Sequence, residues 1–162
     1  HMGVQKIQAN RALRVIPSDN AEIPFPAVAQ SGTNTAAVVN ELVDASATFI
    51  TNNVKTGDIV YNTTDGSAAT VVYVTSETVL VLNADIFAAP AKAYVVYQAS
   101  PQTTLGNTGC WLYVGGTGNI NVVTIGNDTV LFNDVPKGSF IPVQVKKILS
   151  TGTTATLINA LW

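Results

Sequence analysis

The side chains that most often act as bases or nucleophiles are nearly absent from this chain. The only histidine is His1, which we interpret, together with Met2, as the remnant of a tag. Without an authentic histidine, Ser-His-Asp and Cys-His sites are excluded, and so is a histidine-based metal site. The single cysteine, Cys110, begins an apolar run typical of a strand and permits no internal disulfide. We therefore predict that Cys110 is a buried structural thiol.

Ten carboxylates remain as candidates for acid–base or metal chemistry. Six aspartates lie at expected turns or strand ends, where aspartate commonly caps backbone N–H groups. A glycosidase would require two carboxylates to converge in a cleft. A calcium loop is an alternative, although no Asp-x-Asp-x-Asp spacing supports it. We predict no catalytic residue, no metal ligand and no cofactor. The six aspartates are Asp44, Asp58, Asp65, Asp85, Asp128 and Asp134.

Two further motifs are better explained by turns than by chemistry. The glycine-rich stretch Gly115-Gly116-Thr117-Gly118 is not followed by Gly-Lys-Ser/Thr or by a helix, so we expect a hairpin turn and not a phosphate loop. Asn62-Thr63-Thr64 and Asn127-Asp128-Thr129 match the glycosylation pattern. Because no secretion signal is visible, we interpret both as turn residues.

The charge content restricts the classes of partner. Only 11% of the residues are charged and the net charge is −2, against about 25% charged in typical domains. Basic residues occur singly except at Lys146-Lys147, and neighbours on a strand point to opposite faces, so we predict no nucleic-acid partner. The apolar runs are too short for a membrane span, so we predict no membrane partner. The surface is either that of a Thr-rich β protein or one that other subunits cover.

The elements that must position these residues are short strands. Residues 1–32 form an extended arm, because Pro17, Pro24 and Pro26 exclude a helix. Residues 33–98 contain several strand patterns and an Asp-Gly hairpin signal, which predict an inserted β module. Residues 99–162 begin with a linker and continue as a C-terminal β module that packs with the arm. The predicted fold class is all-β, with two small barrel or sandwich modules and an extended, proline-containing N-terminal arm.

The last quarter of the chain is predicted to organise this C-terminal module. Ile141, Val143 and Val145 alternate with polar residues or proline, as in a half-buried strand. Residues 150–154 have turn composition and lead into a second strand over 155–162. We expect these two strands to form a pair, with Trp162 buried on the core or on a neighbouring subunit.

An ordered set of motifs links the arm to the C-terminal module. Together they resemble a family of bacteriophage virion proteins, the small spike-base or head-decoration type also found in gene transfer agents. The resemblance covers about residues 11–30 and 105–162, and the ordered set is more specific than any single motif. The motifs are Arg14-Val15-Ile16-Pro17-Ser18-Asp19, Leu112-Tyr113-Val114-Gly115-Gly116-Thr117-Gly118, Phe132, Val135-Pro136-x-Gly138-Ser139, Pro142-x-x-Val145, Gly152-Thr153-Thr154-Ala155-Thr156 and Ala160-Leu161-Trp162.

Residues 33–98 separate these two segments, whereas short members of the family lack such a block. The block looks like a module of structural proteins from marine and cyanobacterial phages. That family carries no catalytic residues, so none is transferred to this chain. The matching stretches are Val54-Lys55-x-Gly57-Asp58-Ile59-Val60-x-Asn62-Thr63-Thr64 and Leu82-x-Ala84-Asp85-Ile86-Phe87.

The resemblance implies a structural virion protein that is not an enzyme. It would decorate the capsid or form a spike base on the head, bound to the major capsid protein or other virion subunits. The low charge and the apolar C-terminus favour a homo-oligomer, with a trimer as the first expectation. One alternative is a tail or fibre-attachment subunit. Another is a carbohydrate-binding module in which Trp111, Tyr113, Tyr61, Tyr73 and Trp162 stack on sugar rings.

Overall fold

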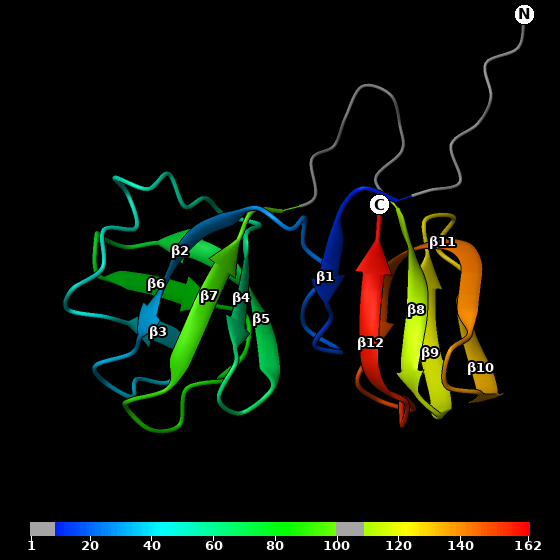
Figure 1. The fold of residues 1–162 in the computed structure, drawn as a ribbon. Coiled ribbons are helices and arrows are strands. Elements are labelled where there is room, and N and C mark those ends of the chain that lie inside the picture. The colour runs from blue at the N-terminus through cyan, green and yellow to red at the C-terminus, as the bar shows by residue number, and fades with distance from the viewer. Residues whose placement is uncertain (1–8, 100–108) are drawn as a thin grey trace, which may run out of the picture.

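The computed structural model describes residues 9–99 and 109–162, and this part of the chain consists of strands, turns and loops. Twelve strands form two six-stranded sheets, which lie side by side in Figure 1. The paired strands are antiparallel. Within the described ranges there is no helix, so the predicted all-β class is confirmed.

The first sheet joins the arm to the last third of the chain. In spatial order its strands are β1 (Ala12–Arg14), β12 (Thr156–Leu161), β8 (Cys110–Gly116), β11 (Phe140–Leu149), β9 (Gly118–Thr124) and β10 (Thr129–Val135). Side chains alternate between the two faces, as the strand period requires. In β8, for example, Leu112 and Val114 are buried, whereas Trp111 and Tyr113 belong to the outer face.

Strand β11 bends this sheet around its core. Its first half pairs with β8 and its second half with β9, and Val145 lies opposite both Cys110 and Thr124 at the changeover. Register shifts on either side of Val145 produce the bend. The sheet therefore curls over a core composed of Val15, Ile23, Cys110, Leu112, Val114, Ile120, Val122, Ile141, Val145, Ile148, Ala155, Ile158 and Ala160.

The predicted pairing of the last two strands is wrong, because β8 lies between β11 and β12. Residues 150–154 do not close a tight hairpin. The backbone N–H groups of Thr154 and Ala155 instead donate to the carbonyl O of Asn119 at 2.9 and 3.0 Å. These bonds guide the chain past the start of β9, so that β12 joins the far side of β8.

The predicted hairpin at Gly115–Gly118 is also wrong. This stretch is a corner between β8 and β9, which do not pair because β11 separates them. A Cβ atom on Gly115 would lie 2.7 Å from the carbonyl O of Leu157, and one on Gly118 would overlap the backbone N of Ala155. The glycines therefore allow the backbone of β12 to cross the corner closely.

The second sheet contains the inserted region. In spatial order its strands are β2 (Val28–Thr33), β7 (Ala93–Tyr97), β4 (Ile59–Asn62), β5 (Ser67–Val74), β6 (Val79–Leu82) and β3 (Glu41–Val43). β2 begins before the predicted module boundary at residue 33 and pairs along β7. Its Gln-Ser-Gly-Thr sequence has the composition of a loop, and cross-strand pairing overrides that propensity.

The second sheet also curls. Ala36, which follows β2, forms a bridge with Val43 of β3, so the two ends of the sheet approach each other. The chain enters and leaves side by side, because the backbone N of Gln98 donates to the carbonyl O of Ala27 at 2.9 Å. The core of this sheet comprises Leu42, Ala47, Phe49, Val54, Val60, Ala69, Val71, Leu80, Leu82, Phe87, Tyr94 and Val96.

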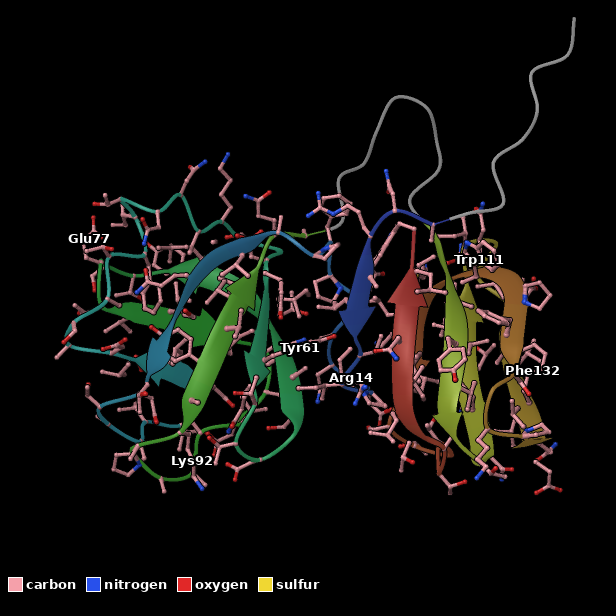
Figure 2. The ribbon with its side chains drawn as sticks, in the orientation of Figure 1. Arg14, Tyr61, Glu77, Lys92, Trp111 and Phe132 are labelled. Carbon is pink, nitrogen blue, oxygen red and sulfur yellow. The ribbon has the colours of Figure 1, made fainter. Side chains whose placement is uncertain are left out.

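The arm packs between the sheets. Its backbone follows the first sheet, where Ser18 N donates to the carbonyl O of Ile148 at 2.9 Å. The Ser18 hydroxyl donates to the carbonyl O of Ala68 in the second sheet at 3.0 Å. A junction cluster of Leu13, Ala21, Ile59, Tyr61 and Ala68 fills the space between these contacts. In Figure 2, Tyr61 lies on the side of the second sheet that faces β1.

Trp162 is the residue shared by two cores. It packs against both the core of the first sheet and the junction cluster. Its ring meets Phe25 of the arm edge-on, with centroids 6.0 Å apart. The side chain is mostly buried, as predicted, and the structure adds a contact with the arm that the sequence did not predict.

Candidate functional site

Three of the six aspartates proposed as caps accept hydrogen bonds from backbone N–H groups of turns, two of them within their own turn and Asp85 from Asn40 in another. Asp44, Asp58 and Asp85 each accept a hydrogen bond from a nearby or loop backbone N–H, at 2.9, 2.9 and 3.3 Å. Asp44 also accepts one from the Tyr94 hydroxyl at 2.6 Å. Burial, together with the hydrogen bond to Asp44, raises the pKa of Tyr94. The capping role predicted for these three aspartates is therefore confirmed.

The other three aspartates have side-chain partners or none. Asp65 forms an ion pair with Lys92 at 3.0 Å and accepts a hydrogen bond from the Asn62 amide at 2.9 Å. These two partners hold the pKa of Asp65 below its usual value. Asp128 accepts a bond from Thr124 at 3.4 Å, whereas Asp134 is exposed at a bulge. Within the described part of the chain, no group of three or more acidic, histidine or cysteine side chains could hold a metal ion.

The two glycosylation-like motifs occupy turns, as predicted. Asn62 is fully buried, and its side chain binds Asp65, the carbonyl O of Ile86 and two backbone N–H groups of the β4–β5 turn. Asn127 is exposed in the turn between β9 and β10, with φ at +69°. Asn62 is therefore a structural turn residue whose side chain is not accessible at the protein surface.

Cys110 is a structural thiol, as predicted. It is 1% exposed in the first core, and its Sγ donates to the carbonyl O of Val145 at 3.5 Å. Burial raises the pKa of the thiol to about 12. A thiol with this pKa is not ionised near neutral pH and does not act as a nucleophile.

The aromatic residues considered for sugar stacking do not form one surface. Tyr61 is buried at the junction, and burial raises its pKa, while Trp162 packs beneath the arm. Tyr73 is exposed on the second sheet. Only Trp111 and Tyr113 share a surface, on the outer side of β8 (Figure 2 labels Trp111).

A third ring completes the surface that these two residues begin. Phe140 of β11 lies opposite Tyr113, and its centroid is 5.3 Å from that of Tyr113 and 6.3 Å from that of Trp111. Phe140 is 55% exposed. We call Trp111, Tyr113 and Phe140 the aromatic face. Phe140 was not identified from the sequence, although its position next to Ile141, which is buried, places it on the outer side of the strand.

The aromatic face continues across the neighbouring strands. The cross-strand register aligns Arg14, Asn159, Tyr113 and Phe140 in one row over four strands. The Arg14 guanidinium donates to the Asn159 side-chain oxygen at 2.9 Å and closes the row at the edge near the arm. Residues directly opposite on neighbouring strands share a face. The side chains in this row therefore change from charged Arg14 at the β1 edge to apolar Phe140 on β11.

Leu157 adds an exposed apolar side chain to the same outer side. It is 55% exposed and lies in β12 with φ at +54°. Left-handed backbone is uncommon for a residue other than glycine, asparagine or aspartate. Backbone strain of this kind often occurs at functional sites, so we include Leu157 among the residues that extend the apolar surface of the aromatic face.

The aromatic face is suited to binding an apolar surface. Aromatic residues are enriched and charged residues are depleted at the centre of protein interfaces. The rings are tilted against each other by 52° and 60°, so they present edges and faces together and not one flat platform.

The described residues also include no helix with the length and apolar character needed to cross a membrane.

Comparisons with protein-family models, curated proteins and solved structures found no match to this chain.

Proposed function

We propose that this protein is a non-enzymatic structural component of a phage virion. In this proposal it is a capsid decoration or head spike-base protein that binds the capsid through the aromatic face and associates with copies of itself. The observation that carries the proposal is the aromatic face, with Phe140 more than half exposed beside Trp111 and Tyr113. Tryptophan and tyrosine are the residues most enriched among those that dominate binding energy at interfaces.

The folding of the arm supports the same proposal. The two segments that resemble phage virion proteins lie far apart in sequence, and they meet in the first sheet. Val15 N donates to the carbonyl O of Ile158, and Ile23 N donates to that of Lys146, at 2.9 and 2.8 Å. The resemblance therefore follows a single packed unit, which is what a shared ancestral domain would produce.

The alternatives have weaker support. A carbohydrate-binding module stacks sugar rings on exposed aromatic faces, but Tyr61 is buried, Trp162 is partly buried under the arm, and the rings of the aromatic face are not coplanar. A tail or fibre-attachment subunit would use the same chemistry as a head protein. Only location on the virion separates these two structural roles.

Binding to heads tests the proposal directly. Heads of the encoding phage, prepared without this protein, would be mixed with the tagged full-length chain and sedimented. We expect the wild-type chain to sediment with the heads and a Trp111→Ala, Phe140→Ser variant to remain in the supernatant. Tyr73→Ser is the matched control, because Tyr73 is an exposed ring on the other sheet, and it should bind like the wild type.

Three results would contradict parts of this proposal. Failure of the wild-type chain to sediment with heads, together with gold labelling on tails, would support the tail alternative. Equal binding by the double variant would exclude the aromatic face as the contact. Binding of the wild-type chain to a glycan array, lost in the double variant, would support the carbohydrate alternative.

A further inference from the structure

Strand β10 is an unprotected edge of the first sheet. It pairs with β9 on one side, and among the described residues no strand pairs with its other side. It is the longest of the four edge strands, with 7 residues, against 6 in β2 and 3 each in β1 and β3. In Figure 1 it forms the border of the first sheet away from the second sheet. A free strand edge offers unpaired N–H and C=O groups to another strand.

The first five residues of β10 lack the features that usually protect an edge, whereas its charged residue, Asp134, and its register shift come after Phe132. Residues 129–133 contain no charged residue and no proline. Val130 and Leu131, on opposite faces of the strand, are 40% and 43% exposed. The other edges are better protected: β1 is short and carries Arg14, β3 is short and carries Glu41, and β2 is interrupted by a register shift. Charges, bulges and short length are the common defences against strand pairing.

The hydrogen-bond register shows which backbone groups of β10 face outward. Thr124 N donates to the carbonyl O of Asp128 at 2.9 Å, which marks this as a hydrogen-bonded pair at the start of the β9–β10 hairpin. Bonded and non-bonded pairs alternate along an antiparallel ladder. The register of β9 and β10 continues without a shift from Thr129 to Phe132. The N–H and C=O groups of Thr129, Leu131 and Asn133 therefore point away from β9.

We propose that β10 pairs antiparallel with β10 of a second copy of this chain, about a two-fold axis at Leu131. This arrangement places each Leu131 opposite the other, Thr129 opposite Asn133, and Val130 opposite Phe132. Within these five residues no charged side chains meet, and apolar side chains meet on both faces. Just beyond them, the same register brings Asp128 of one copy towards Asp134 of the other, where the bulge ends the pairing. The inference deepens the self-association part of the proposed function and does not depend on where the protein sits on a virion.

The same geometry explains why the assembly closes at two copies. A two-fold contact uses the same edge on both chains, so it leaves no copy of that edge free. After Phe132 the register with β9 shifts, and Asp134 adopts φ of +50°. This bulge ends the pairing and restricts it to residues 129–133. The contact therefore gives a dimer in place of the trimer expected from the sequence.

Disulfide trapping tests the register at single-residue resolution. The native Cys110 is buried and does not compete. Bonded partners in antiparallel strands have Cα atoms about 5.5 Å apart, within the range of a disulfide. Oxidised Leu131→Cys should therefore run as a covalent dimer. Thr129→Cys should not, because two-fold pairing separates its two copies by roughly 14 Å, the length of four residues. Mixing Thr129→Cys with Asn133→Cys should restore the covalent dimer.

A backbone variant separates hydrogen bonding from side-chain contact. Leu131→Pro removes an outward N–H, which an edge strand tolerates, whereas Leu131→Ala keeps that group. By sedimentation, with circular dichroism confirming the fold, we expect the wild type to be dimeric, Leu131→Ala weaker but still associating, and Leu131→Pro monomeric.

Several outcomes would overturn the inference. These are a monomeric or trimeric wild-type chain, cross-linking of Thr129→Cys alone as efficient as that of Leu131→Cys, or a folded Leu131→Pro that still dimerises. If Leu131→Pro does not fold, the cysteine pattern alone decides. Failure of the chain to bind phage heads would leave the dimer result unaffected, so the two proposals are tested separately.

Discussion

Truncation of Trp162 should weaken two packed regions at once. Its side chain packs against both the first core and the junction cluster, and its ring meets that of Phe25 at 72°. Replacing a buried tryptophan by alanine costs about 3–5 kcal/mol. An edge-to-face aromatic pair adds about 0.5–1.5 kcal/mol beyond area burial. Because Trp162 is only partly buried, we expect Trp162→Ala to lower the free energy of unfolding by about 3 kcal/mol.

Trp162→Phe should behave very differently. The indole N–H is buried without a hydrogen-bond partner among the described residues. An unsatisfied buried donor costs about 1–3 kcal/mol. Phenylalanine removes this donor and keeps a ring against Phe25, so the lost contact area and the removed penalty offset each other. We expect the stability of Trp162→Phe to lie within about 1 kcal/mol of the wild type.

Urea unfolding followed by far-ultraviolet circular dichroism measures both variants without relying on tryptophan fluorescence. Tyr73→Ala is the control, because Tyr73 is 62% exposed and exposed substitutions usually change stability by less than about 0.5 kcal/mol. The packing argument fails if Trp162→Ala unfolds at the same urea concentration as the wild type. If Trp162→Phe is as damaging as Trp162→Ala, the argument about the unpaired N–H fails.

Three further predictions follow from individual contacts. Native Cys110 should not react with a thiol reagent at pH 8 and should react after denaturation, because burial raises its pKa to about 12; rapid native labelling would contradict this. Asp65→Asn should lower the melting temperature at pH 7. The folded pKa of Asp65 lies below 3.8, so the stabilisation from its ionised form is present above that pH and disappears as the pH falls further. The two melting curves should therefore converge in acid, and a constant difference would count against the Lys92 and Asn62 contacts as its source. Leu157→Gly should be about 1 kcal/mol more stable than Leu157→Ala, because only glycine adopts φ of +54° without strain; chemical unfolding that ranks alanine first would refute this.

The sequence predicted the positions of strands better than their neighbours. The expected strands at 59–62 and 93–97 agree with β4 and β7, since apolar alternation and turn residues mark where a strand begins and ends. Alternation defines which face of a strand is buried, but it does not identify the strand that pairs with it. For this reason the insertion of β8 between β11 and β12 was not predicted. The bend at Val145 was missed because a bulge leaves no strong composition signal.

The candidate site was only partly predictable for a related reason. Trp111 and Tyr113 were considered for sugar stacking, with core packing as the better explanation, and the structure places both on the outer side of β8. Tyr61 and Trp162 are aromatic residues of the same kind, but both pack at the junction between the sheets. The arm creates that junction, and its path between two sheets depends on contacts between residues far apart in sequence. Composition and periodicity carry no information about such contacts.

The arm also has a mechanical consequence. Asp19 is held by the first sheet and the turn that follows β11: its carboxylate accepts a bond from Thr151 N at 3.1 Å, and its backbone carbonyl O accepts one from the Lys147 ammonium at 2.7 Å. The carbonyl O of Asn20, the next residue, accepts bonds from Thr70 and Asn83 of the second sheet, both at 2.8 Å. A force that pulls the sheets apart therefore passes through the peptide unit between Asp19 and Asn20, which links the bonds to the first sheet in series with those to the second. On each side of this unit the bonds act in parallel and share the force, so the weaker of the two sets determines the force at which the sheets separate.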